Sequence, residues 1–342
     1  MNTRSKNARI AARWTVNLLT IVFVLAIAAS AAFAQVYLPG GRLTLTSNTP
    51  VMTSDVSGTP YVYYVPYVGD NVTTANGTAL ANSVLTSQLT LTLNSYLVSG
   101  DIYDIFIFSN DGVLTLCTGP AWNTSTSRGT GTGSTQLTTL NGLWVNAVDI
   151  SCANDTTAYG VNAKNGFYLG SVYLTSTGET SMKLKPSAVS GGTSNVLGLW
   201  NAYNRVRLTA YSRDNNNVWG YTTASWRAAD NSTSNKITFI DGAQQSAPTG
   251  NYSVMASTTS NTVGAYIGLN EDSSTTTPNI TSVTASAPSQ SSATQFSVTE
   301  SFYPSLGLHY VQAVEYSTGS TASFYGTAGS QQLMALTVQI DM

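Results

Sequence analysis

The stretch that decides the fold class is Ile102-Tyr103-Asp104-Ile105-Phe106-Ile107-Phe108, followed by Ser109-Asn110-Asp111-Gly112 and then by Val113-Leu114-Thr115-Leu116. The first segment is dense in β-branched and aromatic residues, which favour strands. Asp111-Gly112 can adopt the positive φ angles that a tight primed turn needs. The last segment resumes a strand pattern, so the stretch predicts an antiparallel hairpin.

The same strand signals recur over most of the chain. Apolar and polar residues alternate with period 2 in short runs, which are separated by turn dipeptides such as Asn76-Gly77 and Asp241-Gly242. One short helical pattern interrupts them, formed by Val196, Leu197, Trp200 and Tyr203. Many short strands with regular turns predict an all-β fold with an antiparallel β-sandwich or jelly-roll-like body. A separate N-terminal hydrophobic helix is expected to precede this body.

The N-terminus has the features of a leader. Residues 1–13 carry four positive charges and no negative one, and an apolar run extends from Leu18 to Ala34. This pattern, with a small-residue cleavage site between Ala34 and Gln35, is typical of a secretory signal peptide over residues 1–34. The alternative is an uncleaved membrane anchor over residues 15–34, which is long enough to cross a bilayer. We therefore predict an exported protein, extracellular or on a cell or virion surface, that meets a membrane only through residues 15–34 if they are kept.

The composition suggests where the body divides. Residues 35–270 hold most of the strand patterns and are predicted to form a β-sandwich body. Residues 271–295 are mostly Ser, Thr, Ala and Pro, which is typical of a long surface loop or a linker. Strand patterns resume at Phe296, so residues 296–342 are predicted to form C-terminal strands that pack on the body.

Charge and residue counts exclude several classes of protein. The 342 residues include 14 Lys+Arg, 16 Asp+Glu, one His and two Cys, and the formal net charge is −2. This balance gives no basic field for nucleic acid. One histidine and two cysteines are too few for a multi-His site, a zinc finger or an iron–sulfur site. We therefore expect no metal, no cofactor and no nucleic-acid partner.

Cys117 and Cys152 are disulfide candidates, because export would place them where disulfides persist. Each lies at the end of a predicted strand. Two buried free thiols are the alternative.

The polar residues that could carry catalysis form no legible constellation. His309 lies inside a predicted strand, where a structural role is the simpler interpretation. Asp101 and Asp104 are three residues apart and would lie on opposite faces of a strand. Asp214 opens a run that resembles part of a calcium loop, but a hairpin turn between Tyr211 and Trp219 explains it better. Glu271-Asp272 is expected to be solvated, and we predict no catalytic residue and no enzyme activity.

The aromatic residues suggest a binding function. Flat rings flanked by Asn, Asp and Ser offer a sugar an apolar face and hydrogen-bond partners. The candidates for glycan binding are Trp122, Tyr61, Tyr63 and Trp219, and Trp122 is the first choice because it lies in a loop-like stretch after a strand. The alternative is that these residues fill the core of a sandwich.

A series of blocks spread over the chain carries a resemblance. They include Gly41-Arg42-Leu43-Thr44-Leu45-Thr46-Ser47, Thr59-Pro60-Tyr61-Val62-Tyr63-Tyr64-Val65-Pro66-Tyr67, Tyr103-Asp104-Ile105-Phe106, Phe167-Tyr168-Leu169-Gly170, Leu199-Trp200-Asn201-Ala202-Tyr203-Asn204-Arg205, Trp219-Gly220-Tyr221-Thr222, Ser225-Trp226-Arg227 and Leu308-His309-Tyr310-Val311-Gln312. In this order, over about residues 41–326, they resemble a family of phage-encoded structural proteins that includes tail-fibre and uncharacterised virion proteins.

The resemblance implies a virion or surface β-protein and brings no catalytic residues. It favours a non-enzymatic structural or receptor-binding component of a phage particle, such as a tail fibre or virion-surface protein. The alternative is an exported cell-surface protein for glycan binding or adhesion. The family members begin near Gly41 without an export signal, so the leader departs from their pattern. The expected partners are other virion proteins or host-surface glycans, and a homo-oligomer is expected.

Overall fold

The computed structural model describes residues 38–155, 159–260, 262–283, 293–328 and 330–342. Residues Pro39–Met342 form one compact unit. The described residues are all-β: apart from one 3-10 turn, η1 (Ala229–Asn231), their regular elements are strands. Every described strand pair is antiparallel except β15–β20, so the predicted all-β class with antiparallel sheets is confirmed.

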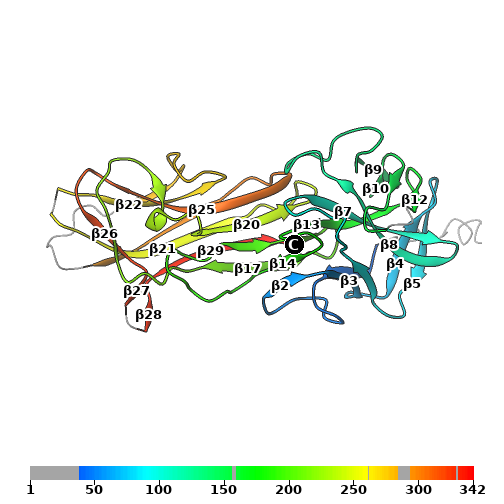
Figure 1. Cartoon of the computed structure of the whole chain (residues 1–342), viewed down its shortest axis with the longest axis horizontal. Helices are drawn as coiled ribbons and strands as arrows, with labels where there is room; N and C mark the ends of the chain where they lie inside the picture. The colour runs from blue at the N-terminus through cyan, green and yellow to red at the C-terminus, as the bar shows by residue number, and fades with distance from the viewer. Residues whose placement is uncertain (1–37, 156–158, 261, 284–292, 329) are drawn as a thin grey trace, which may run out of the picture. The chain divides into compact units, whose positions relative to one another are not determined.

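The largest sheet contains eight strands (Figure 1). Seven follow one another in the order β2 (Val56–Thr59), β14 (Thr180–Met182), β15 (Asn195–Leu197), β20 (Lys236–Asp241), β25 (Gly307–Ser317), β22 (Ala265–Glu271) and β23 (Thr281–Val283). The eighth, β19 (Arg227–Ala228), pairs with β25, with Arg227 opposite Glu315.

A six-stranded sheet packs against this one. Its order is β17 (Arg207–Ser212), β29 (Met334–Asp341), β21 (Thr249–Thr258), β26 (Ala322–Tyr325) and β18 (Trp219–Tyr221), and β24 (Thr294–Ser301) also pairs with β21. A Cβ atom added to Gly250 of β21 would lie 3.0 Å from Leu269 of β22 and 3.3 Å from Val311 of β25. The odd-numbered residues of β22 and β25 therefore face the six-stranded sheet. The two layers form a sandwich-like core, and the jelly-roll arrangement stays a prediction.

The N-terminal part of the unit adds further sheets. A second six-stranded sheet has the order β8 (Val113–Ala121), β7 (Ile102–Asn110), β13 (Phe167–Tyr173), β10 (Leu143–Asn146) and β9 (Leu137–Leu140), and β16 (Leu199–Asn201) also pairs with β13. A three-stranded sheet has the order β1 (Gly41–Thr44), β3 (Tyr61–Pro66) and β6 (Leu89–Thr92). The remaining described strands make two-stranded pairs: β4 (Asn71–Ala75) with β5 (Leu80–Val84), β11 (Ile150–Ser151) with β12 (Gly160–Val161), and β27 (Thr327–Ala328) with β28 (Gln331–Gln332).

The hairpin predicted from residues 102–116 is confirmed. Strands β7 and β8 pair from Asn110 and Val113 outward. Asp111 and Gly112 have φ angles of 47° and 86°, the left-handed values that a two-residue primed turn requires.

The disulfide predicted between Cys117 and Cys152 is formed. The Cα atoms lie 5.3 Å apart, within the usual range for a disulfide, and the sequence separation is 35. Cys117 lies on β8 and Cys152 follows β11, so the bond joins the β7–β8 hairpin to the two-stranded pair of β11 and β12.

The predicted division near residue 270 is wrong as a boundary between units. Strand β25 lies between β20 and β22, and β29 lies between β17 and β21, so the C-terminal strands are central members of both sheets. The predicted loop also begins inside β22, which ends at Glu271, and contains β23. Composition misled here because a Ser- and Thr-rich segment forms a strand where a neighbouring strand supplies backbone partners, as β22 does for β23 and β21 does for β24.

Helices were expected at residues 196–203 and at the N-terminus. The helical pattern at residues 196–203 is wrong, because this segment contains the ends of β15 and all of β16, and the hydrogen bonds of its backbone go to neighbouring strands. The leader (residues 1–34), its cleavage site at Ala34 and Gln35, and the expected N-terminal helix lie outside the described residues. The described part of the chain contains no helix with the length and apolar character needed to cross a bilayer.

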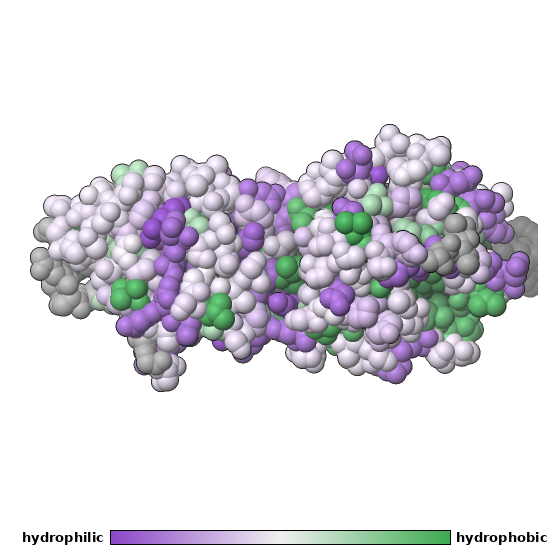
Figure 2. Space-filling model, viewed as in Figure 1, coloured by the Kyte–Doolittle hydropathy of each residue, from purple (hydrophilic) through white to green (hydrophobic). Residues whose placement is uncertain are grey.

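The surface reflects the composition. The face shown in Figure 2 is mostly pale, with small separate groups of strongly hydrophilic and hydrophobic residues. Such a surface offers hydroxyl groups and short polar side chains rather than a strong field of one sign.

Candidate functional site

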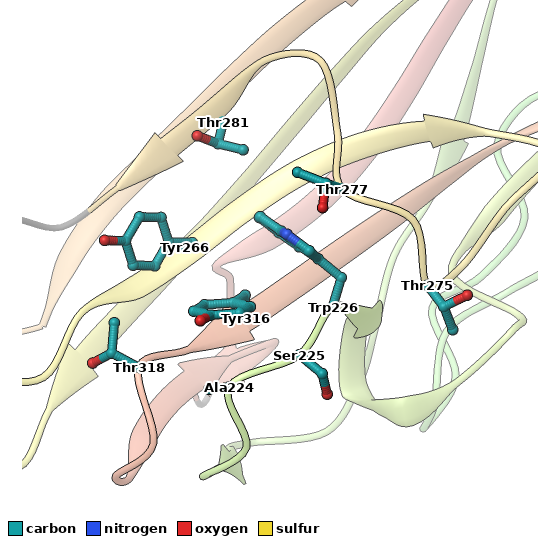
Figure 3. Close-up of a pocket in the computed structure, with 9 residues that line it drawn as sticks. All are labelled: Ala224, Ser225, Trp226, Tyr266, Thr275, Thr277, Thr281, Tyr316 and Thr318. Carbon is teal, nitrogen blue, oxygen red and sulfur yellow. The ribbon is translucent and has the colours of Figure 1, made fainter.

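A pocket with aromatic walls lies on the outer face of the eight-stranded sheet. Its volume is about 620 Å³, within the range of small-molecule sites. Figure 3 shows three rings at its centre with hydroxyl-bearing side chains around them. The lining residues are Ala224, Ser225, Trp226, Tyr266, Thr275, Thr277, Thr281, Tyr316 and Thr318. These nine residues define what we call the aromatic pocket.

The three rings contact one another and remain partly accessible. The ring centroids of Trp226 and Tyr316 lie 5.4 Å apart with a tilt of 42°, and those of Tyr266 and Tyr316 lie 5.4 Å apart at 88°. All three side chains are half-buried. Because each ring is braced by a neighbour, little side-chain freedom remains to be lost when a ligand binds.

Strand alternation explains why the rings point outward. Tyr266 of β22 is directly opposite Tyr316 of β25. Their sequence neighbours on the odd positions face the six-stranded sheet, so successive residues alternate between core and surface. Trp226 immediately precedes β19, whose Arg227 is paired with Glu315, and the same alternation directs its indole to the outer face.

The loop that forms one wall is held against the sheet. The side chain of Pro278 is buried and occupies the space above Gly268, where any Cβ atom would collide with the proline ring. The Asn270 side-chain amide donates a hydrogen bond to the Thr276 carbonyl at 2.7 Å. Both contacts fix the segment that carries Thr275 and Thr277, so this wall is part of the folded structure.

A buried ion pair lies beneath the rings. The Glu315 carboxylate is fully buried and accepts hydrogen bonds from Arg227 Nε at 2.8 Å and from the Trp219 indole N–H at 2.8 Å. Burial raises the pKa of Glu315 to about 7, and the Arg227 charge opposes this rise. The Arg227 guanidinium also lies over the Tyr221 ring, 3.8 Å from its centroid. The pair joins β19 to β25 within the eight-stranded sheet, and the contacts with Trp219 and Tyr221 of β18 connect it to the opposite sheet.

The arrangement is suited to stacking and hydrogen bonding. A pyranose ring has an apolar face of C–H groups that packs on an aromatic ring, and its hydroxyl groups need hydrogen-bond partners. The pocket offers the indole of Trp226 with the hydroxyls of Thr277, Thr281, Thr318 and the two tyrosines. In the described part of the chain, no group of three or more His, Cys, Asp or Glu side chains could hold a metal ion.

The first predicted glycan-binding residue, Trp122, is not exposed. Its side chain is only 5% exposed and is covered by Arg128, whose guanidinium carbon lies 4.2 Å from the ring centroid. Arg128 is held there by Asp104, with Nε 2.6 Å from the carboxylate. The prediction of an exposed loop was wrong because β8 continues to Ala121 and the chain then folds back over the indole.

The other three candidates do not join the aromatic pocket. Trp219 is 8% exposed and uses its N–H on Glu315, so it belongs to the support beneath the pocket. Tyr61 and Tyr63 lie on β3 of another sheet, with ring centroids 6.2 Å apart, and Tyr61 is 42% exposed. The structure therefore brings none of the four predicted residues into the pocket, although Trp219 contacts Glu315, the residue that precedes Tyr316 of the pocket.

The sequence reasoning missed the residues that form the pocket. Trp226 was visible as one of the tryptophans of the body and lies in the block Ser225-Trp226-Arg227. Apolar residues flank Tyr266 in the sequence, but the neighbours of Tyr316 are the polar residues Glu315 and Ser317, so a signal of alternation exists only at 265–267. It could be used only with the register that pairs Tyr266 with Tyr316.

The remaining polar candidates have structural roles. His309 Nδ1 lies 2.6 Å from Asp272, and its Nε2 lies 3.1 Å from the Leu306 carbonyl, so both ring nitrogens are satisfied. The Asp104 carboxylate is fully buried and also accepts hydrogen bonds from Ser171 at 2.6 Å and Thr135 at 2.9 Å.

The hairpin turn predicted around Asp214 is wrong. Strands β17 and β18 lie at opposite ends of their sheet. Asp214 is buried and accepts hydrogen bonds from the backbone N–H groups of Gly191 and Asn216 and from the Asn235 amide. These partners give the segment a connecting role in place of a tight turn.

Comparison with known proteins gives no family. No family model matches the chain, and no curated protein matches it. Among solved structures, the chain is similar to the insecticidal delta-endotoxin Cry8Ea1 from Bacillus thuringiensis, with 6% identity and a TM-score of 0.23 over 91% of this chain and 55% of that chain. A tryptic core variant of Bacillus thuringiensis Cry1Da has 8% identity and a TM-score of 0.20 over 89% of this chain and 51% of that chain. The chain therefore spans about half the length of these two structures. A structure of infectious bursal disease virus, Gx strain, has 13% identity and a TM-score of 0.18 over 88% of this chain and 74% of that chain. TM-scores this low support no inference about fold or function.

Proposed function

We propose that this chain is a non-enzymatic glycan-binding protein, and that the aromatic pocket is its binding site. The observation that carries the proposal is the group of three half-buried rings, Trp226, Tyr266 and Tyr316, inside a ring of hydroxyl groups. A core needs no such arrangement, because its aromatics are covered by apolar side chains. These rings are left accessible at a hollow large enough for one or two sugar units.

The setting that fits this function is the surface of a phage particle. The sequence blocks that resemble phage structural proteins include Ser225-Trp226-Arg227, of which Ser225 and Trp226 line the pocket. A virion protein that binds a glycan receptor presents its sugar site on the particle surface, and the pocket on the outer face of the sheet is proposed as such a site. The homo-oligomer and the contacts with other virion proteins stay predictions.

The second candidate is an exported cell-surface protein for adhesion. It is favoured by the pairing of Cys117 with Cys152, because disulfides persist mainly outside the cytosol. Both settings use the same pocket. Protein mass spectrometry of purified phage particles and of washed host cell surfaces separates them, since the chain should be enriched in only one of the two fractions.

The test of glycan binding uses a glycan array followed by calorimetry on the best ligand. Trp226→Ala should weaken binding at least about thirtyfold, since a central aromatic anchor contributes about 2 kcal/mol or more. Tyr303→Ala is the matched control, because Tyr303 is 85% exposed and lies outside the pocket. Circular dichroism should show that both variants remain folded. A folded Trp226→Ala variant with unchanged affinity would exclude the pocket as the site.

A further inference from the structure

We infer that the aromatic pocket selects neutral glycans and discriminates against sugars that carry a carboxylate, sulfate or phosphate. This inference rests on the proposed function and adds the chemical class of the ligand. Its first support is the lining itself, since none of the nine residues carries a charge. An anion moved from water into such a site loses hydration, and a cation must compensate for the loss.

The charged side chains of the strands around the pocket are turned away from it or already paired. On β19, β22, β23 and β25 they are Arg227, Glu271, His309 and Glu315. Arg227 and Glu315 face the interior of the sandwich, with 2.6 Å between their closest atoms and side-chain exposures of 21% and 0%. The positive charge nearest in sequence to Trp226 is therefore committed to a buried carboxylate.

The remaining charges near the loop wall are negative or balanced. Asp272 accepts a hydrogen bond from the Tyr310 backbone N–H at 2.9 Å and pairs with His309. Glu271 is left without a cation of its own, and burial raises its pKa. Glu271 lies at an odd-numbered position of β22, which faces the six-stranded sheet, and His309 is paired with Asp272. Among the described residues near this wall, no unpaired cation is therefore left for an acidic sugar at the Thr275 end of the pocket.

The lysine on the same sheet is too distant to compensate. Lys236 lies over the Tyr310 ring, 4.6 Å from its centroid. Tyr310 is six residues from Tyr316 along β25, which is roughly 20 Å at about 3.4 Å per residue. Charges separated by more than about 8 Å are largely screened at physiological ionic strength. The hydroxyl groups of the pocket, which donate and accept, instead match the neutral hydroxyl and acetamido groups of sugars.

The experiment compares matched pairs of glycans on the intact protein. The probes are N-acetyllactosamine with its 3′-sialylated and 6-sulfated forms, and a galactan trisaccharide with the corresponding galacturonan trisaccharide. Affinities are measured by calorimetry or a glycan array at low and high salt. We expect each acidic member to bind at least about tenfold more weakly than its neutral counterpart, which corresponds to about 1.4 kcal/mol.

A variant that adds a cation makes the test independent of the chosen sugar. Thr277 is exposed and lies beside Trp226 in the pocket (Figure 3), so Thr277→Lys should preserve the fold. It should raise the affinity for acidic members about tenfold, as a charge-assisted hydrogen bond would. Thr86→Lys is the control, because Thr86 is exposed, lies outside the pocket and gives the same net charge.

The outcomes separate this inference from the proposed function. If acidic members bind more tightly than neutral ones and Trp226→Ala abolishes that binding, the pocket binds glycans and the neutral selectivity is wrong. If the folded protein binds no glycan of either class, both the function and the inference are wrong. Equal gains from Thr277→Lys and Thr86→Lys would assign the charge effect to the whole protein and overturn the selectivity of the pocket.

Discussion

The buried carboxylate beneath the pocket should make stability depend on pH. Glu315 faces Arg227 from β19, the Trp219 N–H from β18, Tyr252 from β21 and the backbone N–H of Asp230. Burial is the largest effect and raises its pKa from 4.5 to about 7. The folded protein therefore binds this proton more tightly than the unfolded chain does.

The sign and the size follow from linkage. Between about pH 4.5 and pH 7 the folded state holds more protons at this site, so the free energy of unfolding falls as the pH rises. A difference of one pKa unit corresponds to about 1.4 kcal/mol, and a rise from 4.5 to about 7 corresponds to about 3 kcal/mol. Below pH 4.5 this contribution is fully present, and above pH 7 it is lost.

The perturbation is Glu315→Gln, which keeps the shape and cannot titrate. Chemical denaturation of both proteins at pH values from 4.5 to 8 gives the unfolding free energy at each pH. The wild type should lose about 3 kcal/mol more than the variant over this range. Glu179→Gln, a half-buried Glu→Gln change elsewhere, should leave the full dependence in place.

Subtracting the stability curve of Glu315→Gln from that of the wild type cancels the contributions of groups that titrate identically in both proteins. Burial raises the pKa of Asp230 to about 6, and this carboxylate titrates in the same window in both proteins. The difference between the two curves reports on Glu315, together with the change that its removal makes to Asp230 through their shared neighbour Arg227. Parallel curves for the wild type and Glu315→Gln would refute the reasoning that the buried carboxylate binds a proton near neutral pH.

Three further predictions concern the scaffold and the pocket wall. Replacing Cys117 and Cys152 by Ser should lower the unfolding free energy, measured by denaturation, by about 4 kcal/mol in the chain-entropy model. Thiol titration of the wild-type protein, unfolded in denaturant without reductant, should find no free thiol. Trp122→Ala should destabilise the protein by about 3–5 kcal/mol because the indole is buried, while any glycan affinity of the folded fraction, measured by calorimetry, stays unchanged. Gly268→Val should displace Pro278 and its loop, so that calorimetry shows weaker glycan binding while circular dichroism still shows the β-fold; unchanged affinity would mean that the loop wall does not contribute.

The fold class could be predicted because its signals are local. The hairpin at Asp111-Gly112 depends on adjacent residues, and the structure has the turn where the sequence indicated it. Glu271, by contrast, opens a Ser- and Thr-rich stretch and still belongs to a strand. That strand is fixed by its partner β25, about forty residues later in the chain, and no local pattern reveals such a pairing.

The site could not be predicted for the same reason. Trp226, Tyr266 and Tyr316 come from three segments, and only the register of β19, β22 and β25 brings them together. Trp122 looked accessible because its neighbours are loop-forming residues. Its burial depends on Arg128 and Asp104, and their pairing is a tertiary contact that residue type alone does not specify.

The blocks that carry the sequence resemblance have two different roles in the structure. The Asn201 side chain accepts a hydrogen bond from Leu43 N at 2.6 Å and donates one to Leu43 O at 3.2 Å, so it replaces a strand partner between two blocks far apart in the sequence. The Arg42 guanidinium donates to the Asn204 carbonyl at 3.0 Å and to the Met342 carbonyl at 3.1 Å. These contacts build the scaffold and leave the pocket untouched.

The block around Trp226 has the second role, because it supplies a ring to the pocket and, through Arg227, a hydrogen bond to the carboxylate beneath it. Scaffold and pocket therefore depend on separate sets of residues. Arg42→Ala should destabilise the fold by about 1–3 kcal/mol in all, because it removes the hydrogen bond to the Asn204 carbonyl and one of the two hydrogen bonds that the Met342 carbonyl accepts. It should not change the glycan affinity of the folded protein, whereas Trp226→Ala should change affinity with little effect on stability. A loss of affinity in folded Arg42→Ala would show that the two sets are coupled, and it would contradict the separation of roles argued from these contacts.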